Sequence, residues 1–508
     1  NSLGGEISLT DGTIKLNETG TLASNVAMSG GTLDADETST LSGTLTHSGD
    51  ITIDVATGKS LTYSGTGISV GAHTITLTGG GNFASGGIIL DNAQSKLVLN
   101  PITLDIASTS SNSLGLDVDA NSTVNALAIG HITPLSIAAG TSLSGAINVS
   151  AGSIKLNETG TLASTVTMSG GTLDVDETST LSGALTQSGN ITIDVLTDKT
   201  LTYSGAALNL GANILTLSGG GTLSNTNSLV LNNADSLLSL SGITTMGDIN
   251  GTAASNQNKG VSVTSSATMG DYDLSAVSYL SIGGSGVTLA GQLNLNPGGE
   301  MITSGEGKYT GDIELAGGAF NAADSLTLDG TVSITADSEI KVADTLTLSQ
   351  AGGLALGANT LTLSGGGSLS SEVMTLDNAN SKLLLDGITL NKAVTTANSS
   401  GLDVDANSTV TAFEVGHTTP VSIAQGVTLS GGVDVSAGSI KLNETGTLAS
   451  TVAMSGGTLD ADESATVSGA LTHSADITID VANTKTLTYS GTAIGVGAHT
   501  ITLTGGGT

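Results

Sequence analysis

Six histidines are the first candidates for catalysis or metal binding, because a neutral imidazole can accept a proton or ligate a metal ion near neutral pH. They are His47, His73, His131, His417, His473 and His499. Near-copies within the chain allow a test. His47 and His73 match His473 and His499, but an intervening copy has Gln187 and Asn213 at those positions. We therefore predict replaceable, outward-facing side chains without a catalytic or metal role.

Pairs of aspartates two residues apart are the second candidates. They occur in "LDADE", "LDVDE" and "LDVDA" as Asp34 and Asp36, Asp117 and Asp119, Asp174 and Asp176, Asp403 and Asp405, and Asp460 and Asp462. Residues i and i+2 share one side of a strand, so we expect both aspartates on an outer face, where stacked carboxylates suit Ca²⁺. The calcium-binding nonapeptide and the EF-hand loop are absent. We favour a solvated acidic face, with weak Ca²⁺ binding as the alternative.

A polysaccharide-cleaving enzyme would need clustered carboxylates beside a basic group. Residues 222–297 depart most from the repeats and contain Lys259, Asp271 and Asp273. Their spacing specifies no acid and base pair. The sequence therefore predicts that the chain is not an enzyme, and we assign no catalytic, cofactor-binding or metal residue. In the alternative that the chain is an enzyme, these three residues are the candidates for its active site.

Threonine and tyrosine suggest two further kinds of surface. Segments such as "TITLT" resemble the Thr-x-Thr arrays of ice-binding solenoids, a lesser alternative because the pairs do not recur in every coil. Tyr63, Tyr203 and Tyr489 occupy one site in three copies. We expect them to fill a recurring gap rather than bind a sugar.

Long repeats must position all of these residues. The segment "IKLNETGTLAS" begins at residues 14, 154 and 440 without change. Residues 13–81 match 153–221 and 439–507, and residues 82–152 match 368–438. The chain thus divides into the end of a preceding block (1–12), block 1 (13–152), block 2 (153–298, with a six-residue expansion), block 3 (299–438, diverged in its first half) and a partial block 4 (439–508). We expect one continuous rod.

A shorter period lies inside each block. Apolar pairs at i and i+2 recur at Ile14, Leu33, Ile53, Ile75, Leu97, Leu116, Leu135 and Ile154, in steps of 19 to 22 residues. Such pairs are typical of strands with one side buried, and the Gly, Ser, Asn and Asp residues between them suit corners. The fold class predicted is all-β: an elongated parallel β-solenoid, or β-helix, with about 20 residues per coil and about seven coils per 140-residue block.

Composition limits the partners. Aromatic residues make up 2% of the chain, cysteine is absent, and 12 basic residues, all lysine, face 44 acidic residues for a net charge of −32. This charge repels phosphate backbones and anionic membranes, and no apolar run reaches the ~20 residues that span a bilayer. We expect no nucleic acid partner and no membrane insertion.

The coil pattern "GGTLDADETSTLSG", with the acidic, cysteine-free composition, resembles the repetitive stalks of bacterial secreted adhesins, namely autotransporter passengers and filamentous-haemagglutinin-like exoproteins. The resemblance covers essentially the whole chain. It implies a non-enzymatic structural or adhesive role at the cell surface or in an extracellular fibre. We expect an internal piece of a longer polypeptide whose partners are further coils, end-to-end copies or surface polysaccharide.

Overall fold

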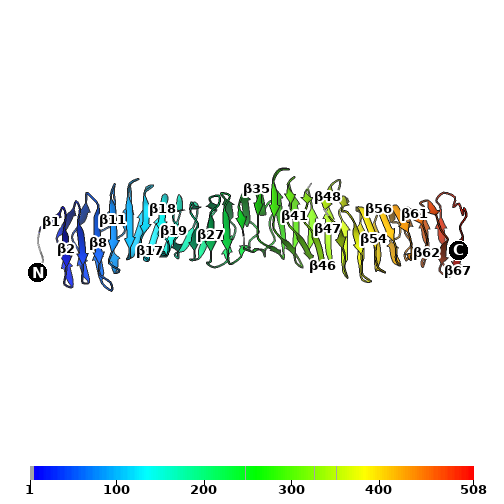
Figure 1. Ribbon diagram of the computed structural model, residues 1–508, viewed down its shortest axis with the longest axis horizontal. Coiled ribbons are helices and arrows are strands. Elements are labelled where there is room, and N and C mark those ends of the chain that lie inside the picture. The colour runs from blue at the N-terminus through cyan, green and yellow to red at the C-terminus, as the bar shows by residue number, and fades with distance from the viewer. Residues whose placement is uncertain (1–4, 246, 325, 351) are drawn as a thin grey trace. The chain divides into compact units, whose positions relative to one another are not determined.

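The computed structural model describes residues 5–245, 247–324, 326–350 and 352–508. These residues form strands β1 (Glu6–Leu9) to β67 (Ile501–Gly505) and contain no helix. They build a parallel β-solenoid with about 20 residues per coil and about 25 turns, which confirms the predicted fold class. The chain forms two compact units, Asn1–Ile249 and Asn250–Thr508, and in each of them successive coils follow one another in sequence order (Figure 1).

A complete coil has three short strands, which form three faces. In unit 1, β5 (Thr32–Ala35), β6 (Ser39–Leu41) and β7 (Leu45–His47) make one coil. The next coil consists of β8 (Ile51–Val55), β9 (Ser60–Tyr63) and β10 (Ile68–Ser69). β5 pairs with β8 and β6 with β9, both in parallel. In some coils one long strand, such as β17 (Ser122–Ile129), extends over the second and third faces.

The first face carries the charged columns and the groove described below. Its strands in unit 1 are β2 (Thr13–Leu16), β5, β8, β11 (Thr74–Thr78), β14 (Lys96–Asn100), β16 (Gly115–Val118), β18 (Ile132–Ile137), β20 (Ser153–Leu156), β23 (Thr172–Val175), β26 (Ile191–Val195), β29 (Ile214–Ser218) and β32 (Leu237–Ser241). Its strands in unit 2 are β35 (Gly260–Ser265), β38 (Val277–Ile282), β41 (Glu300–Ser304), β44 (Ala319–Ala322), β47 (Ser338–Val342), β50 (Thr360–Ser364), β53 (Lys382–Asp386), β55 (Gly401–Ala406), β57 (Thr419–Ile423), β59 (Ser439–Leu442), β62 (Thr458–Ala461), β65 (Ile477–Val481) and β67.

The predicted apolar pairs lie on this first face and form the inner columns of the solenoid. Ile14 pairs with Leu33, and Leu33 with Ile53. Two steps differ from the predicted register, because Ile53 pairs with Leu77 rather than Ile75, and Leu135 pairs with Leu156 rather than Ile154. A shift of two residues keeps every side chain on its side of the sheet, so the apolar pattern alone could not detect it.

The core is narrow and aliphatic. Leu33, Ile53 and Leu77 stack on consecutive coils and are fully buried. Phe83 and Tyr272 are among the largest fully buried side chains. Stacked Leu, Ile and Val columns leave few places for rings, which explains the low aromatic content.

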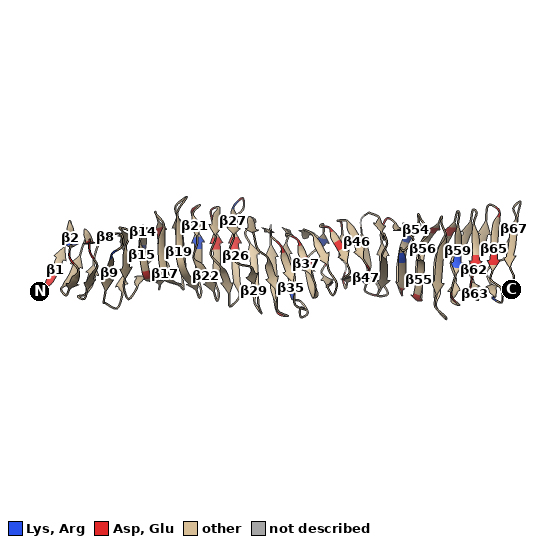
Figure 2. Ribbon diagram, turned by 90° about the horizontal axis from the view of Figure 1, so that it is seen from below, with Lys and Arg blue, Asp and Glu red and all other residues tan. Residues whose placement is uncertain are grey.

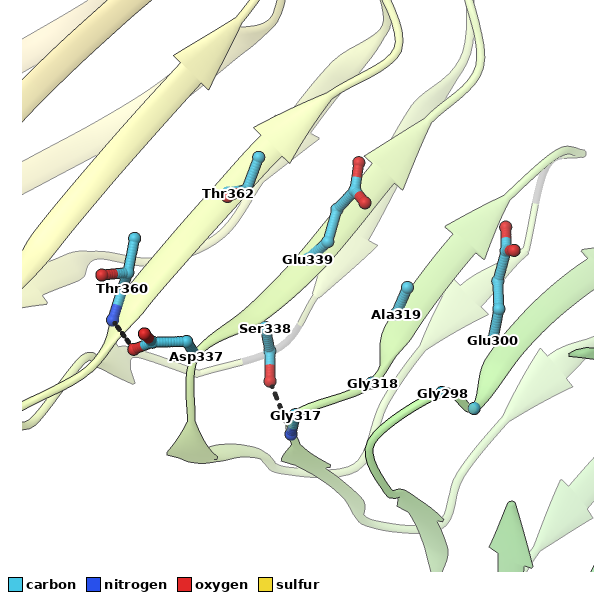
Figure 3. Close-up of a pocket in the computed structure, with 11 residues that line it drawn as sticks. Gly298, Glu300, Gly317, Gly318, Ala319, Asp337, Ser338, Glu339, Thr360 and Thr362 are labelled. Carbon is cyan, nitrogen blue, oxygen red and sulfur yellow. Dashed lines mark hydrogen bonds between the residues drawn. The ribbon is translucent and has the colours of Figure 1, made fainter. Parts of the chain in front are cut away.

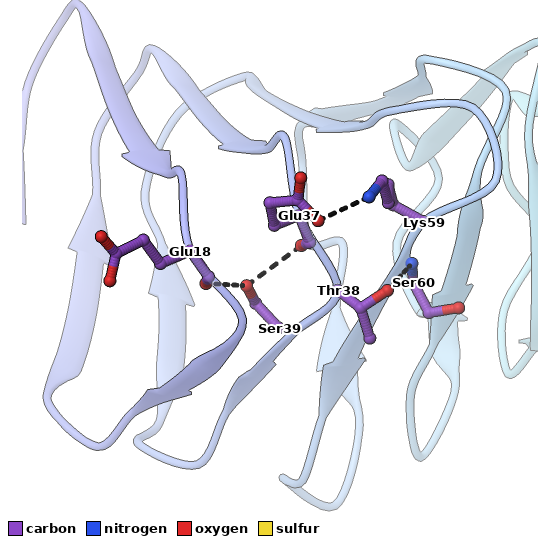
Figure 4. Close-up of polar contacts among 6 residues, drawn as sticks. All are labelled: Glu18, Glu37, Thr38, Ser39, Lys59 and Ser60. Atoms are coloured by element: carbon purple, nitrogen blue, oxygen red, sulfur yellow. Dashed lines mark hydrogen bonds and ion pairs between the residues drawn. The ribbon is translucent and has the colours of Figure 1, made fainter.

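Polar side chains tie successive coils together at the corner between the first two faces (Figure 4). Ser39 is buried and its hydroxyl faces the carbonyl oxygens of Glu18, in the preceding coil, at 3.2 Å and Glu37 at 3.0 Å. Lys59 of the next coil donates to Glu37 Oε2 at 2.5 Å. The matching contacts in block 2 join Ser179 to two carbonyl oxygens and Lys199 to Glu177. The corner thus repeats with the block.

The limits of the blocks and their continuity as one rod remain predictions. Residues 1–4, at the start of the expected 1–12 segment, lie outside the described residues.

Candidate functional site

The candidate site is an open groove of about 470 Å³ on the first face of block 3, over strands β41, β44, β47 and β50 (Figure 3). Glu300 and Glu339 stand on either side of Ala319. The register places them in one outward column, because Glu300 pairs with Ala319 and Ala319 with Glu339. The two carboxylate-bearing positions are therefore two strand spacings apart, about 9.6 Å.

Small residues make the floor and one end of the groove. Gly298, Gly299, Gly317 and Gly318 precede β41 and β44 and line the groove together with Ala319. The next outward residue of the column is Thr362, which pairs with Glu339. Because Ala319 has only a methyl group, the space between the two glutamates stays open to solvent.

Hydrogen bonds hold the walls of the groove. Asn321 Nδ2 donates to Glu300 Oε1 at 2.8 Å, and Ser364 Oγ donates to Glu339 Oε1 at 2.5 Å. At the corner, Asp337 Oδ1 accepts from Thr360 N at 2.6 Å and Ser338 Oγ accepts from Gly317 N at 3.0 Å. Each glutamate keeps lone pairs with which it can accept hydrogen bonds from hydroxyl or cationic groups of a ligand.

The sequence interpretation missed Glu300 and Glu339. Blocks 1, 2 and 4 have a hydroxyl residue at each matching outward position, as in the block 1 column Thr13, Thr32 and Thr52. In the sequence, residues 300–367 of block 3 stand out only as a diverged copy. Comparing the outward positions block by block would have found the change from threonine to glutamate.

A second column on the first face carries opposite charges in blocks 1, 2 and 4. In block 1, Lys15 pairs with Asp34, Asp34 with Asp54, and Asp54 with Thr78. The same order is Lys155, Asp174, Asp194 and Ser218 in block 2, and Lys441, Asp460, Asp480 and Thr504 in block 4. Figure 2 shows the last of these as a blue stripe on β59 followed by red stripes on β62 and β65.

Each of these lysines binds the aspartate pair of the following coil. Lys15 Nζ lies 2.7 Å from Asp34 Oδ2 and 3.3 Å from Asp36 Oδ2. The hydrogen bonds that Lys15 donates to the two carboxylates, Asp34 first, and the negative charges of Asp34 and Asp36 raise the pKa of Lys15. Asp34 is only 9% exposed, although its position faces outward. These three aspartate pairs, Asp34 with Asp36, Asp174 with Asp176 and Asp460 with Asp462, are therefore partners of lysine.

The expectation that both aspartates of a pair lie on the outer face of a strand was wrong for most pairs. Asp36 and Asp119 follow the last residues of β5 and β16, because the chain turns there into a corner. The stacked neighbours of Asp117 are Val98 and Ser136, so no carboxylate stacks on Asp117. Within the described residues there is no group of three or more His, Asp or Glu side chains that could hold a metal ion. Weak Ca²⁺ binding stays a prediction without a site.

The column in block 1 contains one carboxylate, Asp54, whose ionised form is disfavoured by its surroundings. Burial, together with the negative charges of Asp34 and Asp36, raises the pKa of Asp54, although Lys15 opposes this effect. Asp54 Oδ1 is buried and has no hydrogen-bond partner among the described residues. In block 2 the matching Asp194 accepts a hydrogen bond from Ser218 Oγ.

The histidines are half-buried or exposed, as predicted. Two pairs come together on the third face: His47 and His73 have ring centroids 5.7 Å apart, and those of His473 and His499 are 5.9 Å apart. His131 lies at an exposed corner.

Of the three residues of the enzyme alternative, Lys259 lies on a different face from Asp271 and Asp273. Lys259 directly precedes β35 of the first face, whereas Asp273 lies in β37 (Tyr272–Leu274) of the third face. Asp273 Oδ1 accepts from Asn294 Nδ2 at 2.8 Å. No ion pair joins Lys259 to Asp271 or Asp273 in the described part of the chain.

Two of the three repeated tyrosines fill a gap inside the solenoid, as predicted. Tyr63 and Tyr203 are buried, whereas Tyr489 is half-buried. Their hydroxyl oxygens accept from the backbone N–H groups of Leu45 at 3.2 Å and Leu185 at 3.1 Å, each in the preceding coil. These tyrosines therefore connect neighbouring coils.

Threonine forms one outward column rather than two. Thr32, Thr52 and Thr76 are in register, but the column beside them carries Asp34 and Asp54 before it reaches Thr78. A flat Thr-x-Thr array is thus interrupted by charge, as the sequence indicated.

No protein-family model matches the chain, and neither a curated protein nor a solved structure does. A search of the described residues for a helix long and apolar enough to cross a membrane gives no candidate. Contacts within the molecule are therefore the basis for any functional assignment.

Proposed function

We propose that this chain is a non-enzymatic structural or adhesive repeat region of a bacterial extracellular fibre or surface adhesin. The observation that carries the proposal is the recurrence of whole sets of coil-to-coil contacts. The pair of Lys15 with Asp34 and the pair of Lys59 with Glu37 return in block 2 as Lys155 with Asp174 and Lys199 with Glu177.

Recurrence of the same contacts suits a protein that functions through its length. Each coil touches only its neighbours, so a block that carries its own contacts can be duplicated without redesign. The net charge of −32 favours solubility of such a protein. Its partners in this proposal are further coils of a longer chain or copies stacked end to end, with surface polysaccharide as a ligand.

Electron microscopy of the isolated protein tests the proposal. A structural element gives separate rods of fixed length or long fibres. Deletion of residues 153–298 should shorten each rod by about seven coils, ~34 Å, and leave the remaining coils folded. Compact particles, or unfolding of the rest after the deletion, would contradict the proposal.

A second candidate function is binding or cleavage of a polysaccharide in the groove of block 3. The backbone positions of Glu300 and Glu339 lie about 9.6 Å apart by strand spacing, just above the separation of about 6.5–9.5 Å that inverting glycosidases have between the carboxyl groups of their acid and base. Turnover of a polysaccharide that is lost in both Glu300→Gln and Glu339→Gln, but not in Thr13→Ala, would favour this candidate. Turnover abolished instead by changes at Lys259, Asp271 or Asp273 would support the alternative drawn from the sequence.

A further inference from the structure

Four titratable side chains meet in block 1 where β7 of one coil lies beside β10 of the next. These are His47, Asp50, His73 and Asp91, which we call the charged junction. His47 Nδ1 lies 3.0 Å from the carbonyl oxygen of Gly49, in its own coil. His47 Nε2 lies 2.8 Å from the carbonyl oxygen of Ser69, in β10 of the next coil.

Both partners of the His47 ring are hydrogen-bond acceptors. A carbonyl oxygen cannot donate, so each of these contacts needs an N–H on the ring. A neutral imidazole has one N–H and an imidazolium has two. The neutral ring can therefore satisfy one of the two carbonyl oxygens at a time, and the protonated ring satisfies both.

Two carboxylates, Asp50 and Asp91, lie near the two rings. Asp50 Oδ1 lies 4.0 Å from His73 Nδ1 and accepts from Thr74 N at 2.8 Å. Asp91 accepts hydrogen bonds from Ser69 Oγ and, at 2.9 Å, from Gly71 N. Burial opposes ionisation of Asp91, but these hydrogen bonds and the charge of His47 lower its pKa.

No other ionisable group lies on the strands beside His47. β4 (Asn25–Met28), which pairs with β7 on the other side, has no titratable side chain, and neither has β10. The junction therefore contains two imidazoles and two carboxylates. The two carboxylates carry the charge opposite to that of an imidazolium.

Block 2 has the same junction built from uncharged residues. Gln187, Asn190, Asn213 and Asn232 replace His47, Asp50, His73 and Asp91, and we call this set the neutral junction. Asn190 Oδ1 accepts from Ile214 N at 2.8 Å and Asn232 Oδ1 accepts from Gly211 N at 2.9 Å, as Asp50 and Asp91 do in block 1.

The contact between coils is also retained in the neutral junction. Gln187 Nε2 donates to the carbonyl oxygen of Leu210 at 3.4 Å, and Leu210 directly follows β28 (Leu208–Asn209), which matches β10. An amide side chain has its donors at every pH. Block 2 is thus an internal control for the charges of block 1.

We propose that the charged junction is a pH-responsive clamp between two coils, in which protonation of His47 supplies the second N–H and fastens β7 to β10, whereas the neutral junction holds its coils equally at all pH values. The pH range follows from the groups that titrate. As classes of side chain, histidine titrates near pH 6.5 and aspartate near pH 3.9.

The sign of the effect differs for the two kinds of group. Proton binding to His47 adds a hydrogen bond in the folded state, so its stabilisation is present at low pH and lost as the pH rises through the histidine range. The lowered pKa of Asp91 means that its stabilisation is present above about pH 3.9 and lost as the pH falls below that value. The clamp is therefore tighter on the acidic side of the histidine range than on its basic side, as long as Asp91 stays ionised.

Hydrogen–deuterium exchange of the full chain, followed by mass spectrometry, tests the proposal without a mutation. Peptides that cover β10 and β28 are compared at about pH 5.5 and about pH 8, on either side of the histidine range, with labelling times scaled to the intrinsic exchange rate. We expect about fivefold more protection of β10 at the lower pH, the factor that one net hydrogen bond contributes, and no change for β28. Equal responses of β10 and β28 would overturn the proposal.

Two variants identify the responsible group. His47→Gln introduces the side chain that block 2 already accommodates, and should remove the pH response of β10. Transfer of the charged junction into block 2, by Gln187→His with Asn190→Asp, Asn213→His and Asn232→Asp, should give β28 the response. A response that persists in His47→Gln would show that His47 is not the clamp. If either variant fails to fold by circular dichroism, the comparison of β10 and β28 in the unmodified chain still decides.

Discussion

Blocks 1 and 3 have similar inner columns on the first face and different outer columns. In block 1 the outward residues of β2, β5 and β8 are Thr13, Thr32 and Thr52 in one column, beside Lys15, Asp34 and Asp54 in the other. In block 3 the corresponding strands β41, β44 and β47 carry Glu300, Ala319 and Glu339, beside Ile302, Asn321 and Lys341. The negative charge has moved from one column to the other, and a lysine stands where block 1 has Asp54.

This difference shows that the choice of residue is restricted on the inward side of the sheet and much less so on its outward side. Leu33 in block 1 and Phe320 in block 3 occupy matching inward positions, and both are buried apolar side chains. Inward side chains must fill a closed core, whereas outward ones meet solvent and the neighbouring coils. Block 3 could therefore gain a groove without any change in the pairing of its strands.

The largest effect is expected from the inner columns, where the two blocks should respond alike. Leu33→Ala and Phe320→Ala each remove a buried side chain and should lower the free energy of unfolding by about 2–5 kcal/mol. Urea denaturation followed by circular dichroism measures the loss. An inner substitution that costs less than about 1 kcal/mol in one block and several in the other would break the comparison, because it would mean that the cores of the two blocks are packed differently.

The inner columns were the part of the fold that the sequence could predict. Pairs such as Ile14 and Leu16 recur with a period that only stacked coils explain. The number of faces was not accessible, because many strands of the second and third faces are as short as β10 (Ile68–Ser69) and have too few residues for a periodic signal. The two-residue register shifts at Leu77 and Leu156 were also hidden, because they preserve the apolar alternation.

The candidate site could be predicted only in part. The aspartate pairs were recognised, but their lysine partners lie about one coil away in the sequence, as Lys15 and Asp34 do. The groove depends on one small residue, Ala319, between two glutamates that are 39 residues apart in the sequence (300 and 339). Such a site becomes visible only when the register between coils is known.

A smaller effect is expected from the outer charged column, and here blocks 1 and 2 should differ. Asp54→Asn removes a charge that burial and the carboxylates of Asp34 and Asp36 disfavour. Because Asp54 is partly exposed and screened by solvent, the gain in the free energy of unfolding at neutral pH should be about 0.5 kcal/mol. Local hydrogen exchange of β8 measures it.

The pH dependence of this gain has a definite sign. A raised pKa means that folded Asp54 holds its proton more tightly than the unfolded chain does, so ionisation destabilises the fold as the pH rises. The advantage of Asp54→Asn should therefore disappear below about pH 4. Asp194→Asn is the control, because Ser218 already donates to Asp194. An equal gain in both variants would refute the conclusion that the surroundings of Asp54 disfavour its ionised form more than those of Asp194 do.

The smallest effect on stability is expected from exchanging the outer residues that distinguish the two blocks. Ala319→Thr gives block 3 the residue that Thr32 provides in block 1, and Thr32→Ala is the reciprocal change. Both positions face outward on strands, so each change should alter the free energy of unfolding by no more than about 0.5 kcal/mol. The threonine side chain would nevertheless occupy the space between Glu300 and Glu339. If the groove binds a polysaccharide, Ala319→Thr should abolish that binding in affinity electrophoresis, while Thr32→Ala leaves it unchanged. Binding that survives Ala319→Thr would place the ligand elsewhere on the solenoid, and a large loss of stability would show that the outer columns of block 3 are as constrained as its core.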